Sequence, residues 1–280
     1  MLEIEQVSFA YPGQSPALKN VSAVVREGEF IGLAGRNGSG KTTLTRIMVG
    51  LAKPKAGQVM LDGKPTKSCG PDVMARAIGY VFQNPDKQIF RDTVSQEVAF
   101  GPEQLGWNEA EKQNAVDTAL KLTGIEHTAA KYPRSLPRSV RQRIAIASAL
   151  ALRPRFLILD EPTSGQDAEE KNQLMELLTE LNRQGIGIIL VTHDMELMLA
   201  HTKRSIVLHQ GEKVFDGPTA ALFSEGGHNV SDWGLRIPEA AAVAGKLAMA
   251  MEPVCSVEEL AAGIKQQLRG EKDENTGAAV

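Results

Sequence analysis

One run of residues in this chain has the spacing needed to hold phosphate. It follows an apolar, strand-like segment ending at Leu33 and fits G-x-x-x-x-G-K-[ST] at every fixed position. Glycines let the backbone N–H groups turn toward phosphate oxygens, and the helix that follows adds the positive end of its dipole. Lys41 would supply a cation to the phosphates and Thr42 a hydroxyl to Mg²⁺. The residues predicted to bind nucleotide here are Gly35, Arg36, Asn37, Gly38, Ser39, Gly40, Lys41, Thr42 and Thr43.

A pair of acids follows a second apolar run. Residues 156–159 read Phe-Leu-Ile-Leu, which is typical of a strand buried on both faces, and Asp160 and Glu161 come next. Ligands collect at the carboxyl ends of strands in open α/β sheets, so both acids are expected beside the phosphate loop. Asp160 is predicted to hold Mg²⁺, and Glu161 to face the attacking water as a general base or positioning group.

Two more polar residues end apolar segments. His193 follows the run 186–191, where an imidazole can stabilise developing charge or organise water. Gln83 follows residues 78–82, and its amide oxygen can reach a metal ion or the attacking water. Taken alone, each residue is more often structural than catalytic. The predicted catalytic residues are Glu161, His193 and Gln83, and the predicted metal ligands are Thr42, Gln83 and Asp160.

Hydrophobic periodicity predicts the elements that position these groups. Residues 21–25 and 30–33 read as strands joined by a hairpin-like turn at 27–29. A helical stripe with its apolar residues on one face follows the phosphate loop; it consists of Leu44, Ile47, Met48 and Leu51.

Capping signals mark further helices. Asn108 with Glu111, and Asp167 with Glu170, have capping-box spacing, and Gly124 is a plausible helix end. Alternating buried strands and amphipathic helices predict a mostly parallel α/β core. After Gly217 the composition changes: residues 239–251 are Ala-rich, and a capping box at Ser256 and Glu259 precedes Leu260, Ile264 and Leu268.

Composition excludes several classes of protein. The chain has 280 residues, 42% hydrophobic and 23% charged, with a net charge of −3, so a buried core is expected and a general polyanion-binding surface is not. Two distant cysteines give neither a disulfide framework nor a metal motif, which fits a reducing cytosol. We expect no signal peptide, and no apolar run approaches the ~20 residues of a membrane span. Membrane association is therefore expected to go through a partner.

In this order and spacing, the motifs resemble the ATP-binding subunit of ABC transporters over about residues 1–217. Residues 80–90, Tyr-Val-Phe-Gln-Asn-Pro-Asp-Lys-Gln-Ile-Phe, and 161–167, Glu-Pro-Thr-Ser-Gly-Gln-Asp, look like the energy-coupling-factor (ECF) group, which imports vitamins and transition metals. The resemblance implies an α/β P-loop NTPase fold of the ABC type. It has a RecA-like, mostly parallel sheet, an N-terminal antiparallel β subdomain, a helical subdomain at about 84–152, and a C-terminal helical extension with a frayed tail at 218–280.

The same resemblance implies ATP and Mg²⁺ as cofactors and ATP hydrolysis as the reaction. Tyr11 matches an aromatic that stacks on adenine, Asp167 matches an acid that communicates across the dimer, and Gln88 matches a segment lining the groove for membrane coupling helices. Family members work as head-to-tail dimers at the cytoplasmic face of the membrane. The implied partners are a second ABC ATPase, a transmembrane coupling subunit and a substrate-capture membrane subunit, with no nucleic acid.

The chain departs from the family at its signature motif, Leu-Ser-Gly-Gly-Gln. The aligned residues are Leu136, Pro137, Arg138, Ser139 and Val140. The missing serine normally donates its hydroxyl to the γ-phosphate, and the missing glycines allow close backbone approach. Proline offers neither a hydroxyl nor an N–H.

Three interpretations of this signature remain open. The signature is weak and a partner ATPase with an intact signature completes this chain's site; or Arg138 or Ser139 contacts phosphate in another geometry; or the chain is a non-hydrolytic regulatory subunit. Losing one transition-state donor costs roughly 10²–10³ in rate, which a homodimer would suffer in both sites and a heterodimer in one. We therefore predict an asymmetric heterodimer. A DNA-repair-type ATPase is a further alternative, but the long coiled-coil run and cysteine cluster usual in that class are absent from the sequence.

Overall fold

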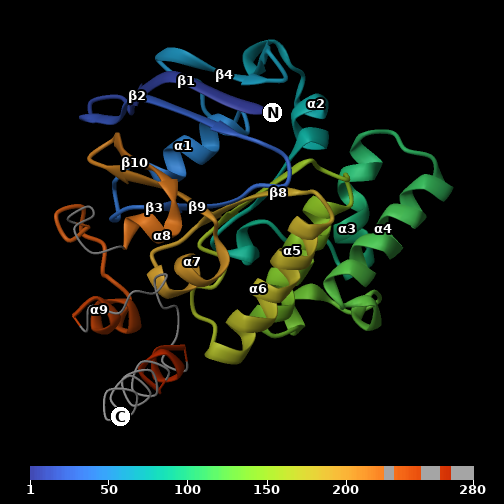
Figure 1. The fold of residues 1–280 in the computed structure, drawn as a ribbon. Helices are drawn as coiled ribbons and strands as arrows, with labels where there is room; N and C mark the ends of the chain where they lie inside the picture. The colour runs from blue at the N-terminus through green and yellow to red at the C-terminus, as the bar shows by residue number, and fades with distance from the viewer. Residues whose placement is uncertain (224–229, 247–258, 266–280) are drawn as a thin grey trace.

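The computed structural model describes residues 1–223, 230–246 and 259–265, and two β-sheets organise them (Figure 1). A four-stranded antiparallel sheet has the strand order β2-β1-β4-β5. Its strands are β1 (Leu2–Ala10), β2 (Pro16–Val25), β4 (Ala56–Leu61) and β5 (Lys64–Pro65). This sheet contains the N-terminal strand and lies above α1 (Lys41–Met48), the helix that follows the phosphate loop, in the view of Figure 1.

The second sheet has six strands in the order β10-β9-β3-β8-β7-β6. Its strands are β3 (Phe30–Ala34), β6 (Ile78–Val81), β7 (Phe156–Asp160), β8 (Gly187–Val191), β9 (Arg204–His209) and β10 (Glu212–Pro218). Every pairing is parallel except the β9–β10 hairpin. The prediction of a mostly parallel α/β core is therefore confirmed.

Helices cover the sheet and form a lobe of their own on one side (Figure 1). The lobe contains α3 (Val94–Gln104), α4 (Glu109–Thr123) and α5 (Arg138–Leu150), which pack on one another. The other α-helices are α2 (Pro71–Ala77), α6 (Ala168–Arg183), α7 (Met195–His201), α8 (Thr219–Leu222) and α9 (Glu239–Lys246). Among the described residues, no helix is both long and apolar enough to span a bilayer.

Alternate residues of the central strands enter two different cores. Leu157 and Leu159 of β7 belong to the cluster shared with the helical lobe, whereas Phe156 and Ile158 belong to the cluster beneath α1 and the antiparallel sheet. Since side chains alternate along a strand, a strand buried on both faces must be apolar at every position. This explains the uninterrupted apolar run that delivers Asp160 to the sheet edge.

Local capping fixes two helix starts as the sequence predicts. Asn108 and Glu111 form a complete capping box on α4, which ends at Gly124 in the left-handed conformation, with φ of 67°. Asp167 and Glu170 form the same box on α6. In both helices, side chains satisfy N–H groups that have no partner inside the helix.

Two local predictions are wrong. The turn at 27–29 joins β2 to β3, but these strands lie in different sheets and make no hairpin. β3 is buried at all five positions and needs parallel neighbours on both edges, which β8 and β9 supply. Leu51 is not part of the α1 stripe, because the helix ends at Met48 and Gly50 turns the chain with φ of +79°. Leu51 is 62% exposed.

Only part of the two helices predicted near the C-terminus lies within the described residues. The Ala-rich helix extends over Glu239–Lys246, and the rest of the predicted span to residue 251 lies outside the described residues. Ser256 and Leu268 also lie outside them, as does the tail from Gly270, while 259–265 is helical. Ala240, Ala244 and Leu260 share a small apolar cluster.

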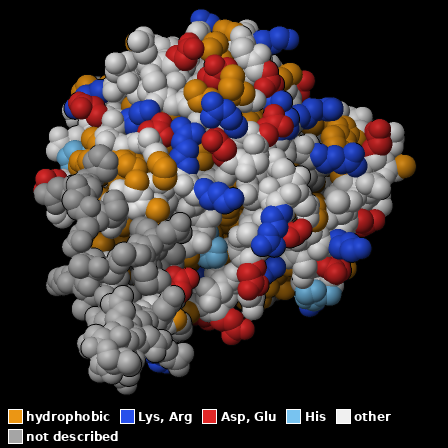
Figure 2. All heavy atoms as spheres, viewed as in Figure 1, with side chains coloured by type: hydrophobic (Ala, Val, Ile, Leu, Met, Phe, Trp, Pro, Cys, Tyr) orange, Lys and Arg blue, Asp and Glu red, His pale blue; other side chains and the backbone are white. Residues whose placement is uncertain are grey.

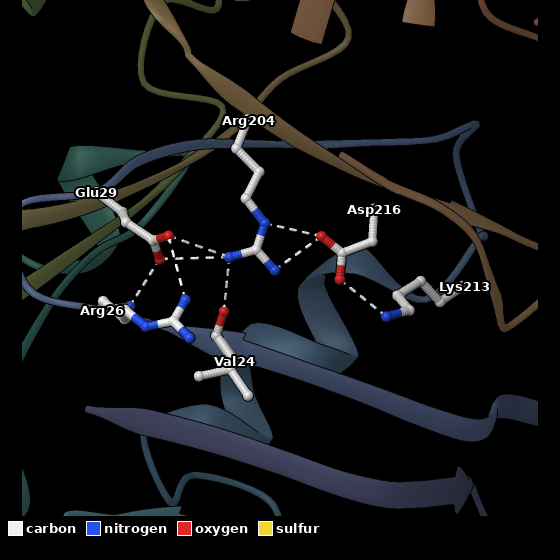
Figure 3. Close-up of polar contacts among 6 residues, drawn as sticks. All are labelled: Val24, Arg26, Glu29, Arg204, Lys213 and Asp216. Atoms are coloured by element: carbon white, nitrogen blue, oxygen red, sulfur yellow. Dashed lines mark hydrogen bonds and ion pairs between the residues drawn. The ribbon is translucent and has the colours of Figure 1, made fainter. Parts of the chain in front are cut away.

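Arg204 links the two sheets through a network of polar contacts (Figure 3). Its guanidinium donates to Asp216 at 2.8 Å, to the carbonyl oxygen of Val24 at 2.9 Å and to Glu29 at 3.3 Å. Glu29 also accepts from the backbone N–H of Arg26 at 2.7 Å, and Lys213 contacts Asp216 at 2.8 Å. One side chain thus ties β9 and β10 to the end of β2.

We expect Arg204→Gln to lower the free energy of unfolding by about 1–3 kcal/mol, between the values for exposed and buried ion pairs. The Arg204 side chain is only 23% exposed, and its replacement leaves the carboxylates of Glu29 and Asp216 without the guanidinium that they share. Arg26→Gln is the matched control, because the Arg26 side chain is 64% exposed and its backbone contact survives the substitution. Urea unfolding measures both; equal losses in the two variants would show that the network is not what stabilises this junction.

Candidate active site

The phosphate loop connects the buried strand β3 to α1 and needs glycine at two positions. Gly35 and Gly40 have φ of +147° and +107°. A Cβ on Gly35 would collide with the carbonyl oxygen of Leu208, and one on Gly40 with that of Ala17. These close approaches let the loop curl at the start of α1, where backbone N–H groups and the helix dipole favour an anion.

Two polar side chains of the loop are buried. The ammonium of Lys41 donates to the carbonyl oxygens of Gly35 at 2.7 Å and Arg36 at 3.1 Å. Burial lowers the pKa of Lys41, and the nearby charges of Glu161 and Asp160 oppose that shift. The hydroxyl of Ser39 is buried and has no hydrogen-bond partner among the described residues. A phosphate group would satisfy both the ammonium and the hydroxyl.

Asp160 ends β7 beside Thr42, the first residue after Lys41. The Thr42 hydroxyl donates to Oδ2 of Asp160 at 3.1 Å. Burial raises the pKa of Asp160, while hydrogen bonds from Thr42 and Tyr80 act in the opposite direction. A carboxylate that has lost much of its water is a site where a cation is favoured.

Glu161 lies at the centre of the predicted catalytic residues. The Nε2 amide of Gln83 donates a hydrogen bond to Oε2 of Glu161 at 3.0 Å. Nδ1 of the exposed His193 lies 3.4 Å from Oε1 of the same carboxylate. Each carboxylate oxygen therefore has its own neighbour. The backbone of Glu161 is left-handed, with φ of 47°, and its N–H donates to the Val191 carbonyl oxygen at 2.9 Å. Such a conformation costs of order 1–3 kcal/mol and is found most often at functional sites.

A cavity of about 530 Å³ is lined by Tyr11 and by residues 37, 38 and 40–43 of the predicted nucleotide-binding set, whereas Gly35 and Arg36 line a second cavity and Ser39 lines neither. The first cavity is also lined by Gln83 and Asp160. The Tyr11 hydroxyl lies 3.3 Å from that of Thr43, which places the aromatic ring at the edge of the phosphate loop. The structure thus brings together residues predicted separately from four parts of the sequence.

The second cavity, of about 620 Å³, shares Asn37 and Glu161 with the first. It is lined by Arg36 and Asn37 of the phosphate loop, by His193 and by the segment 234–239. Arg36 packs so closely on Gly234 that a Cβ there would collide with its side chain. The segment 234–239 therefore borders the candidate active site, which sequence patterns did not predict.

The divergent signature segment, residues 136–140, lines neither of these two cavities. Pro137 precedes α5 and makes no side-chain cap, so the helix begins at Arg138. The Arg138 guanidinium lies over Gly165: a Cβ on Gly165 would be 3.6 Å from its Cζ. The signature thus neighbours the Gly165–Asp167 loop rather than the phosphate loop of its own chain.

The donor set fits Mg²⁺. The residues that line the cavity include Thr42, Asp160 and Gln83, whose hydroxyl, carboxylate and amide groups each carry an oxygen of the type that this ion prefers. Among the described residues, no cluster of three or more His, Cys, Asp or Glu side chains could hold a metal alone. This is expected where substrate phosphates and water complete the coordination.

Tyr80 is the main residue that the sequence patterns missed. Its hydroxyl donates to Oδ2 of Asp160 at 3.3 Å and lies 3.2 Å from the Thr45 hydroxyl. Burial raises its pKa to about 12, so the phenol keeps its proton at neutral pH. A tyrosine in an otherwise apolar strand was the available signal, since a buried phenol needs a hydrogen-bond partner.

Comparison with known proteins identifies the family. Residues 18–164 match the ABC transporter family, which is more than half of the chain. The chain belongs to this family. It carries the ATP-binding domain of the family and is called the ABC ATPase below; members of the family use this domain to hydrolyse ATP and power transport. The predicted ABC-type fold is also confirmed by solved structures.

Two relatives resemble the ABC ATPase over most of its length. It is 40% identical to an ABC transporter ATP-binding protein of Pyrococcus furiosus over 94% of this chain and 99% of that protein. It is 35% identical to the energy-coupling factor transporter ATP-binding protein EcfA of Methanothermobacter thermautotrophicus, over 89% and 81%. Two Methanosarcina relatives are much longer, and the chain spans only 36% and 38% of their length.

A solved structure supports the ECF-like assignment of this ABC ATPase. CbiO1 of Clostridium perfringens, described as part of the ABC transporter complex cbiONQ, superimposes with a TM-score of 0.75 at 34% identity, over 88% of this chain and 98% of that one. The cassette MJ0796, solved as a dimer with ADP and Pi, gives a TM-score of 0.69 at 31% identity, over 78% and 99%.

Proposed function

We propose that this ABC ATPase hydrolyses ATP in an asymmetric pair with a second ABC ATPase and powers import of a micronutrient, a vitamin or transition-metal ion, through an ECF-type transporter. One contrast carries the proposal. The chain's own P-loop side is complete, with Glu161 held between Gln83 and His193, while its signature helix begins after a proline. The chain therefore offers one good half-site and one poor one.

The residues of the good half-site divide the chemistry among them. Loop N–H groups and Lys41 bind the phosphates of ATP. Glu161 takes a proton from water as the water oxygen bonds to the γ-phosphorus and the bridging oxygen leaves with ADP. Gln83 and His193, each beside one oxygen of Glu161, fix the direction of that carboxylate. Thr42, Asp160 and Gln83 would hold Mg²⁺, which would neutralise charge on the phosphates.

The poor half-site explains the need for a partner. In a head-to-tail dimer each ATP lies between one P-loop and the other subunit's signature. A partner with an intact signature would complete this chain's P-loop site, whereas this chain's Pro137 and Arg138 would weaken only the partner's site. The dimeric solved form of the related MJ0796 cassette supports the pairing, and the related EcfA and CbiO1 support the transporter class.

A groove on the helical lobe suits the proposed membrane partner. It has a volume of about 400 Å³ and is lined by Phe82, Gln88, Phe90 and Phe100 among others. The Phe90 ring is 59% exposed and packs edge-on against Phe100 at 4.8 Å. The buried Glu97 carboxylate accepts from the N–H groups of Phe90 and of its neighbour, at 2.9 and 2.8 Å, and so holds the aromatic at the rim.

We expect Phe90→Glu to lower the fraction of this chain that sediments with membranes of its source cells by about tenfold or more, because buried aromatic anchors contribute about 2 kcal/mol or more at interfaces. Leu51→Glu is the matched control, since Leu51 is equally exposed but lines a different cavity. ATP binding should be unchanged in both. Equal membrane recovery for Phe90→Glu and the wild type would contradict docking at this groove.

A further inference from the structure

Tyr80 reaches the metal-holding acid from the neighbouring strand. In the parallel pairing of β6 with β7, Tyr80 lies opposite Ile158. Asp160 is two residues further along β7 and so lies on the same face as Ile158. The long tyrosine side chain spans this diagonal and places its hydroxyl 3.3 Å from Oδ2 of Asp160.

The hydrogen-bond directions at this point are set by chemistry. A carboxylate only accepts, so the Tyr80 hydroxyl donates its single proton to Asp160. The Thr45 hydroxyl has one proton, which it can donate either to the Tyr80 oxygen at 3.2 Å or to the carbonyl oxygen of Thr42 at 3.1 Å. Thr42 donates to the same Oδ2 of Asp160 at 3.1 Å. The carboxylate of Asp160 is therefore held by two hydroxyls from two different elements, α1 and β6.

The ring of Tyr80 does not by itself explain the choice of tyrosine. It packs edge-on against Phe82 with a centroid distance of 5.0 Å and borders two cavities, the groove of the helical lobe and one of about 580 Å³ beside α2. A phenylalanine would fill the same space. The hydroxyl is the difference, and Asp160 and Thr45 are its partners.

We infer that Tyr80 is a positioning residue for Asp160: its hydroxyl fixes the carboxylate in the orientation that Mg²⁺ bound with ATP requires. Groups that hydrogen-bond a metal ligand commonly change metal affinity about 10–100-fold when they are removed. Tyr80 does not line the cavity that Tyr11 and Lys41 line, so its effect should be confined to metal binding. The inference rests on the proposed Mg²⁺ role of Asp160.

The test compares ATP affinity with excess Mg²⁺ and with EDTA, measured by equilibrium binding without turnover. In Tyr80→Phe the gain in affinity that Mg²⁺ provides should fall about tenfold, while the affinity in EDTA stays within about twofold of the wild type because the P-loop is intact. Thr45→Val removes the hydroxyl that lies 3.2 Å from the Tyr80 oxygen and should also lower the gain in affinity from Mg²⁺. Thr45→Ser keeps that hydroxyl and should keep the gain. Tyr132→Phe removes an exposed phenol elsewhere and serves as the control.

The outcomes separate the inference from the proposed function. If the wild type gains affinity from Mg²⁺ and Tyr80→Phe gains equally, only the inference fails. It also fails if Tyr80→Phe loses affinity equally with and without metal, because that is a general distortion of the site. If the wild type itself gains nothing from Mg²⁺, the proposed metal site fails and the inference fails with it.

Discussion

Restoring the signature motif is expected to raise ATP hydrolysis by the purified chain about 10²–10³-fold, the usual effect of one transition-state donor. The restored chain carries Pro137→Ser, Arg138→Gly, Ser139→Gly and Val140→Gln. Serine regains both a hydroxyl and an N–H at the start of α5, and glycines clear the side chains from the helix N-terminus. Steady-state phosphate release measures the change.

The control for this experiment is Pro137→Ala with the other three residues unchanged. It removes the proline ring but adds no hydroxyl, so its hydrolysis rate should stay near that of the wild type. A wild-type chain that already hydrolyses ATP as fast as the restored one would contradict the prediction. That result would instead favour a homodimer in which Arg138 or Ser139 contacts the γ-phosphate in another geometry.

Glu161→Gln is expected to lower hydrolysis by about 10³-fold in the restored chain, within the range for losing a general base. The amide has nearly the shape of the carboxylate and can occupy the same left-handed backbone position, but it cannot take a proton from water. ATP affinity should change by less than about threefold, because the P-loop contacts remain. Phosphate release and equilibrium ATP binding separate the two effects.

A surface acid provides the matched comparison for Glu161→Gln. Glu109 is exposed at the start of α4, far along the chain from the site, and Glu109→Gln should leave the hydrolysis rate unchanged. If Glu161→Gln retains most of the activity, Glu161 is not the base, and the positioning role left open for it from the sequence becomes the better description.

Local rules predicted the parts of the site that are encoded by short segments. The phosphate loop needs only its glycines, Lys41 and a strand-to-helix context, all of which are contiguous in sequence. Asp160 and Glu161 follow because a strand buried on both faces ends at the edge where ligands bind. The caps at Asn108 and Asp167 are equally local, since each box closes within four residues.

Contacts between distant segments were beyond those rules. Leu51 fits a helical period, but the helix had already ended at Met48. The strand at 30–34 pairs with β8 and β9, more than 150 residues away, instead of with its neighbour in sequence. Tyr80 acquires its role only when β6 is placed beside β7, and Arg36 meets Gly234 only when the C-terminal segment folds back. Periodicity carries no information about such partners.

Complementation in trans tests the asymmetric half-sites most directly. The wild-type chain is mixed with a second version that has the restored signature and Lys41→Ala, so the only complete site joins the wild-type P-loop to the restored signature. We expect each version alone to be nearly inactive and the mixture to hydrolyse ATP at least about tenfold faster than the sum of the two, because the restored signature supplies the missing transition-state donor. A mixture no faster than that sum would contradict the asymmetric half-sites.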